Sequence, residues 1–363
     1  RDRYIEACKI IYNKQSKLED FQKAEQLLLN ESRSGNVLAI QDLGKLYSTD
    51  KLGEKDEKKS FSFYEEAFQG FMEIEPDSDF MFPYEPKFDG QIMKPVNMRS
   101  YVWYRIGKMH CYGLGTEQDY AQSFEWFLKS AHEGNKFAQY SLANLYYYGN
   151  GVEKDLSQAF WWYRKSSEQG QPYASYAVAQ MYSKGEYVAE NKETAQRYYK
   201  AALSGFLELE SKDQADDNLY YKLGAMYKNG LGTEIDIPKA IEYFEKSTEN
   251  MWSTYQLGRL YLFGAEELEK DKEKAVEWLT KSANDGNEYA QNMLDNMAQF
   301  ENTILANTIF ALFANLCKCI EDDYTQKYKS VRHTVDSRLR RMIRQKKQSF
   351  GIKDEQSQSY EQS

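Results

Sequence analysis

The sequence has few cysteine, histidine and proline residues. Of its 363 residues, four are cysteine, three are histidine and six are proline. Four scattered cysteines are too few for a disulfide framework, so we expect a protein of the reducing cytoplasm. The three histidines (His110, His132, His333) stand far apart and form no metal-binding motif. Few prolines beside thirty tyrosines and six tryptophans favour helices packed on helices.

Long apolar runs are also absent. No segment approaches about 18 uninterrupted apolar residues, so no transmembrane helix is predicted. The chain opens with Arg1-Asp2-Arg3-Tyr4 and no apolar signal core follows, which we interpret as a piece of a longer protein that is not secreted. Hydrophobic residues make up 41% and charged residues 28%, which excludes wholesale disorder.

Positive charge is scarce except near the end of the chain. The net charge is -9, yet Lys327 to Lys353 holds ten Lys or Arg against one acidic residue. An acidic body with a basic ending indicates charged partners.

The chain repeats itself. A small residue in an apolar frame recurs six times, with spacings of 63, 36, 36, 45 and 34 positions, at Gly44, Gly107, Ala143, Ala179, Gly224 and Gly258. A second apolar frame, such as Ala159 with Trp162-Tyr163, follows each of the last five. A period of about 36 with two apolar stripes predicts helix-turn-helix repeats. The two long spacings mark insertions at about 72–99, which holds four of the six prolines, and 206–217.

Glycine-rich segments separate the two helices of a repeat. They are Gly113-Leu114-Gly115, Gly149-Asn150-Gly151 and Gly230-Leu231-Gly232. No Lys-Ser/Thr pair follows them, so we favour left-handed turns over a phosphate-binding loop. Asp119, Asp155 and Asp236 are then expected to cap the second helices, with Pro238 in a first turn.

These motifs resemble the Sel-one-like repeat, a relative of the tetratricopeptide repeat. The resemblance rests on Leu-Gly-x-x-Tyr, Gly-x-Gly, Asp, and Ala with Trp-Phe and Lys-Ser-Ala, from about Phe21 to Met297. It implies an all-α, right-handed solenoid over residues 1–299 whose concave surface binds proteins or peptides.

A narrower resemblance concerns relaxases, the mobilisation nucleases of Gram-positive conjugative elements. The run Tyr104 to Tyr120 and the basic ending Val335 to Lys347 are similar to the repeat region downstream of some relaxases. The chain has no histidine cluster for nicking, so that chemistry would lie upstream of Arg1.

The segment after the repeats is apolar at helical spacing. Its apolar residues are Ile304, Leu305, Ile309, Leu312, Phe313, Leu316 and Ile320. We predict a capping helix over 300–323 that covers the last repeat. A membrane-surface helix is the alternative, and acidic flanks disfavour it. Cys317 and Cys319 in this helix are interpreted as buried thiols, not metal ligands.

The basic helical segment and disordered end, 324–363, leave two interpretations open. Six cations, Arg338, Arg340, Arg341, Arg344, Lys346 and Lys347, would attract nucleic-acid phosphates without sequence specificity. The same segment would equally suit a contact with the acidic repeats or with another protein.

A candidate binding groove follows from the repeat register. With the small residue as position zero, position -3 reads Tyr104, Tyr140, Tyr176, Tyr221 and Tyr255. Position +1 includes Lys108, Asn144, Gln180 and Arg259, and it lies on the same helix face. The related tetratricopeptide repeats imply a ligand groove there. The alternative is that the tyrosines only pack between adjacent first helices.

We therefore expect a non-catalytic interaction scaffold with no cofactor and no metal. The relaxase resemblance implies the C-terminal part of a relaxase that recruits transfer proteins or helps hold DNA. The alternative is a free-standing repeat adaptor in bacterial signalling or envelope maintenance.

Overall fold

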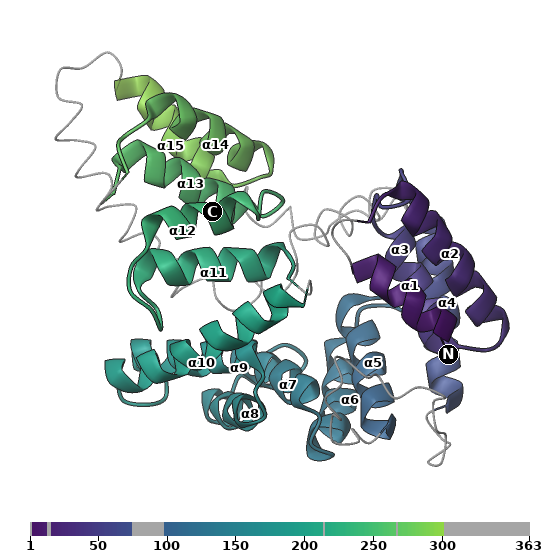
Figure 1. The fold of residues 1–363 in the computed structure, drawn as a ribbon. Coiled ribbons are helices and arrows are strands. Elements are labelled where there is room, and N and C mark those ends of the chain that lie inside the picture. Colours follow the sequence, from purple (N-terminus) through teal and green to yellow (C-terminus); the bar gives the residue numbers. More distant parts are fainter. Residues whose placement is uncertain (1, 13–15, 75–97, 213–214, 266–267, 301–363) are drawn as a thin grey trace, which may run out of the picture. The chain divides into compact units, whose positions relative to one another are not determined.

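The computed structural model describes residues 2–12, 16–74, 98–212, 215–265 and 268–300 (Figure 1). These residues form helices and contain no strand beyond one isolated bridge between Ala265 and Leu268. The helices are α1 (Asp2–Tyr12), α2 (Leu18–Arg33), α3 (Val37–Tyr47), α4 (Glu57–Ile74), α5 (Met98–Tyr112), α6 (Tyr120–His132), α7 (Lys136–Tyr148), α8 (Leu156–Glu168), α9 (Pro172–Lys184), α10 (Lys192–Ser211), α11 (Asp217–Asn229), α12 (Ile237–Glu245), α13 (Met251–Phe263), α14 (Lys272–Asn284) and α15 (Glu288–Phe300).

The helices pack as repeated pairs. The six pairs are α3/α4, α5/α6, α7/α8, α9/α10, α11/α12 and α13/α14, and second helices also contact the next first helix. The pair α1/α2 precedes them and α15 follows. The predicted all-α helical-repeat fold is confirmed. The middle of the first insertion, the predicted capping helix and the basic segment lie outside the described residues.

The small residue of each first helix makes room for its second helix. All six small residues are buried. A Cβ atom added to Gly107 would lie 2.6 Å from the Phe127 ring. Close packing of the two helices therefore explains the glycine at position 107, although glycine costs about 1 kcal/mol of helix propensity relative to alanine.

In four of the six repeats, a buried serine at or just after the end of the second helix bonds to the start of its own first helix. Each donates its hydroxyl to a backbone carbonyl at 2.5–2.7 Å: Ser130 to Ser100, Ser166 to Lys136, Ser247 to Asp217 and Ser282 to Met251. These bonds satisfy polar groups that packing removes from water.

The glycine turns have the predicted conformation. All six glycines of the three Gly-x-Gly turns are left-handed, with φ between 64° and 73°. A Cβ on Gly151 would lie 2.3 Å from the Tyr120 backbone, so the turn also packs on the second helix of the preceding repeat. Asp119, Asp155 and Asp236 cap the second helices as predicted, and Pro238 lies in a first turn.

The turn between α9 and α10 departs from this pattern. Tyr187 stands 36 residues after Gly151, where the other repeats have the second glycine, and it keeps a left-handed φ of 66°. A side chain is disfavoured in that conformation. The Tyr187 ring instead lies outward, 57% exposed, and packs on Phe160 with ring centroids 5.7 Å apart.

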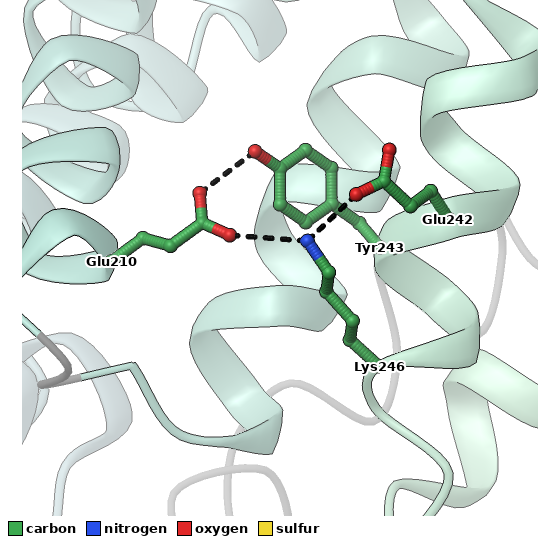
Figure 2. A network of polar contacts seen from close by, with 4 residues as sticks. All are labelled: Glu210, Glu242, Tyr243 and Lys246. Carbon is green, nitrogen blue, oxygen red and sulfur yellow. Dashed lines mark hydrogen bonds and ion pairs between the residues drawn. The ribbon is translucent and has the colours of Figure 1, made fainter. Parts of the chain in front are cut away.

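The second insertion extends a helix. α10 runs for 20 residues, seven more than α8, and so takes up the first half of 206–217. Figure 2 shows what the added turns contact. The Tyr243 hydroxyl of α12 donates to Glu210 Oε2 at 2.8 Å, and Lys246 Nζ lies 3.4 Å from Glu210 Oε1 and 2.7 Å from Glu242. The insertion thus connects one repeat to the second helix of the next.

Candidate functional site

The position -3 tyrosines form a row along successive first helices. Tyr104, Tyr140, Tyr176 and Tyr221, on α5, α7, α9 and α11, are half-buried. Tyr104 contacts Phe137 of α7, with ring centroids 5.9 Å apart. Tyr140 contacts Tyr173 of α9 at 6.0 Å. The rings of Tyr104 and Tyr140 therefore also pack against the next repeat.

Each of these rings also packs against an aromatic ring on the second helix of its own repeat. Ring centroids lie 5.9 Å apart for Tyr104 and Phe127, 5.8 Å for Tyr140 and Tyr163, 5.4 Å for Tyr176 and Tyr199, and 6.1 Å for Tyr221 and Phe244. Aromatic pairs at these distances stabilise a fold beyond the apolar area that they bury. The rings therefore have a packing role, as the alternative interpretation expects.

Packing does not use the polar ends of these side chains fully. The hydroxyl groups of Tyr104 and Tyr176 make no hydrogen bond to a described residue, and they are not among the atoms sealed from solvent without a partner. Burial of the side chain raises the pKa of Tyr104 and of Tyr176 to about 12. These hydroxyls are neutral at physiological pH and can donate or accept.

Position +1 places polar groups beside the tyrosines. Lys108 Nζ lies 5.9 Å from the Tyr104 ring centroid. Asn144 accepts a hydrogen bond of 2.6 Å from the Tyr163 hydroxyl, and its amide NH₂ group donates to the Tyr140 hydroxyl. Gln180 is half-buried. The structure therefore brings the predicted tyrosine and polar positions together on α5 and α7.

The last predicted pair, Tyr255 and Arg259 on α13, differs from the rest. Tyr255 is 0% exposed, because Trp252 and Tyr289 of α15 pack on it at 6.2 Å and 6.3 Å. Arg259 lies over the same ring, 5.7 Å from its centroid. The expectation that Tyr255 is a contact residue is corrected: its ring is part of the core.

One further cation joins the row, and the repeat register did not single it out. Lys222 of α11 lies over the Tyr176 ring of α9 at 4.5 Å and 6.0 Å from the Tyr173 ring. The position on α11 that matches Phe137 and Tyr173 is Asn218, so no aromatic residue fills it. We call Tyr104, Tyr140, Tyr176 and Tyr221, with Lys108, Asn144, Gln180 and Lys222, the tyrosine face.

Other chemistry finds little support among the described residues. No group of three His, Cys, Asp or Glu side chains in that part of the chain is arranged to hold a metal ion. Within the same residues, no helix has the length and apolar character needed to cross a bilayer. The six cations from Arg338 to Lys347 lie outside the described residues.

Comparisons with known proteins agree with the repeat register. The family model "Sel1 repeat" matches six segments that together make up more than half of the chain: 37–70, 104–135, 136–171, 172–205, 219–250 and 253–287. A curated relative, the Sel1-repeat-containing protein YjcO of Escherichia coli K12, is 35% identical over 103 residues, which cover 26% of this chain and 44% of that protein. The chain thus spans less than half the length of this relative.

Two solved structures are similar to this chain. A Sel1 repeat protein from Oxalobacter formigenes is 22% identical, with a TM-score of 0.49 over 74% of this chain and 90% of that one. The protein c5321, a protective antigen present in uropathogenic Escherichia coli strains, is 24% identical, with a TM-score of 0.34 over 75% and 67%. Six consecutive matched repeats decide the assignment: the chain belongs to the Sel1 repeat family.

Proposed function

We propose that the chain is a non-catalytic interaction scaffold and that the tyrosine face binds a protein or peptide. One observation carries the proposal. Half-buried tyrosines occupy the same position on four successive first helices, and amide and ammonium groups lie beside several of them. Flat apolar contact with hydrogen-bonding groups at its edge is the composition that protein interfaces favour.

A peptide display selection tests this proposal. A random peptide library is selected on the full chain, and the bound peptides are tested on a blocked variant, Gln180→Trp. Gln180 lies one helical turn after Tyr176 on α9, so an indole there should obstruct the face beside Tyr176 and cause at least a tenfold loss of affinity. Gln122→Trp is the matched control, because Gln122 is exposed on the second helix α6. Equal loss in both variants, or none in either, contradicts the proposal.

The relaxase role is a narrower hypothesis. Its support is the sequence resemblance of Tyr104 to Tyr120 and of the basic ending, and none of the relatives named above bears the name of a relaxase. A histidine-rich nuclease domain encoded directly upstream of Arg1 would support it. A different upstream domain would favour an adaptor in signalling or envelope maintenance.

Nucleic-acid contact through the basic segment is a separate hypothesis, supported by six cations within ten residues. Changing Arg340, Arg341, Arg344 and Lys347 to alanine should weaken DNA binding about equally for all sequences and reduce its salt dependence. Unchanged affinity in a filter-binding titration across salt concentrations would exclude this contact.

A further inference from the structure

Two lysines of the tyrosine face each lie beside two aromatic rings. Lys108 Nζ lies 5.9 Å from the Tyr104 ring centroid and 5.8 Å from that of Tyr112, all on α5. Lys222 Nζ lies between Tyr173 and Tyr176 of the neighbouring first helix, at 6.0 Å and 4.5 Å. Ring faces attract an ammonium group and at the same time keep water from it.

Neither ammonium group forms an ion pair with a described carboxylate. The charged groups around Lys108 are Arg105 on its own helix and Lys45 on α3, with the Cys111 thiol nearby. Around Lys222, the acidic group is Asp216, which already caps α11 by accepting from the Leu219 amide. Loss of water lowers the pKa of both lysines to about 8.

Desolvated cations in proteins are normally paired with an anion. Within the described part of the chain, Lys108 and Lys222 have no such anion, and both lie on the surface that we propose binds another molecule. An arriving carboxylate would supply it, and the low local dielectric would strengthen the attraction.

We propose that the partner of the tyrosine face is an acidic peptide segment whose carboxylates are received by Lys108 and Lys222. This inference rests on the proposed function. The intervening repeats carry Asn144 and Gln180 at position +1, so the face calls for spaced carboxylates joined by neutral residues. Nucleic acid carries a charge on every phosphate, so it matches two separated lysines less well than a peptide with spaced carboxylates does. The chain's own segment Lys327 to Lys353, with ten cations and one acid, would be repelled.

The test uses the peptides selected above on the full chain. Peptides that Gln180→Trp releases are expected to be enriched in Asp and Glu over the library. One of them, labelled with fluorescein, is titrated by fluorescence polarisation. Lys108→Met and Lys222→Met, which keep the apolar stem, should each weaken binding about tenfold, since a charge-assisted hydrogen bond is lost. The same peptide with Gln for Glu should lose as much affinity.

Two exposed lysines serve as controls. Lys165 of α8 and Lys200 of α10 are exposed on second helices, so Lys165→Met and Lys200→Met should leave affinity unchanged. A circular dichroism melt of each variant shows that the fold is kept.

The outcomes separate the two proposals. Released peptides that are not acidic, and that bind both Lys→Met variants normally, overturn the acidic partner while the binding face stands. Equal losses in all four Lys→Met variants indicate nonspecific charge attraction and also overturn it. A labelled single-stranded oligonucleotide that binds more tightly than the peptide in a Lys108-dependent way overturns the peptide assignment. Failure to select any peptide that Gln180→Trp releases counts against the face itself.

Discussion

A Cβ atom on Gly224 of α11 would lie 2.6 Å from the Phe244 ring of α12. Such a contact is closer than packed carbon atoms allow, so Gly224→Ala should force the two helices apart. The overpacking costs about 1–3 kcal/mol, and the gain in helix propensity offsets about 1 kcal/mol of it. We expect the free energy of unfolding in urea to fall by up to about 2 kcal/mol.

The partner residue provides the control. Phe244→Leu makes room beside Gly224, so Gly224→Ala should cost less in that background than in the wild type. The two changes then couple in a double-mutant cycle. Strict additivity would show that the Phe244 ring is not what the added methyl group meets.

Tyr187 predicts a difference between two substitutions that remove the same ring. Tyr187→Gly and Tyr187→Ala both lose the contact with Phe160, but alanine keeps the left-handed strain at a φ of 66°. The glycine variant should therefore be more stable by about 1 kcal/mol in urea unfolding. At Gln122, in the helix α6, the same comparison should favour alanine by about 1 kcal/mol. The same sign at both positions would contradict a strained turn.

The ring contacts of Tyr140 and Tyr176 predict which substitutions leave the fold intact. Each ring packs on the second helix of its own repeat, and the Tyr140 ring also contacts Tyr173 of α9. The double variant Tyr140→Ala with Tyr176→Ala should therefore lower the free energy of unfolding by about 3 kcal/mol or more. Tyr140→Phe with Tyr176→Phe keeps the rings and should cost about 1 kcal/mol or less. Urea titrations of both double variants check this. Similar costs for the two would mean that the hydroxyls, not the rings, stabilise the repeats.

Local features of the repeat could be predicted from the sequence because they depend on neighbouring residues. Asp119 caps α6 because its own position and the backbone of the next turn decide the bond. Gly151 takes a left-handed φ for the same kind of reason. The repeat period, together with these signals, is sufficient to predict the helix pairs.

Side-chain environments between repeats could not be predicted in the same way. The contact of Lys222 with Tyr176 could not be predicted, because Tyr176 lies 46 positions earlier on another repeat. It also depends on Asn218, which stands where other first helices carry an aromatic residue. Tyr255 shares its register position with Tyr140, yet Trp252 and Tyr289 bury it. Register identifies which face a residue occupies, whereas exposure depends on what the next helix carries.

Lys108 and Lys222 predict how stability changes with pH. Burial lowers their pKa to about 8 in the folded chain, whereas an unfolded lysine has a pKa of about 10.4. Between these values the unfolded state binds more protons, so the free energy of unfolding should rise as pH increases from 8 to about 9.5. Near pH 10 the trend should reverse, because burial raises the pKa of Tyr104 and Tyr176 to about 12 and the unfolded tyrosines lose their protons first.

Urea titrations at pH 7, 8, 9 and 9.5 measure this rise in the wild type and in the double variant Lys108→Met with Lys222→Met. In the variant, the rise should be smaller by up to about 1 kcal/mol per pH unit. An identical dependence on pH in the wild type and the variant would show that both ammonium groups are hydrated. The control is the double variant Lys165→Met with Lys200→Met, which removes two exposed charges and should show the same dependence on pH as the wild type.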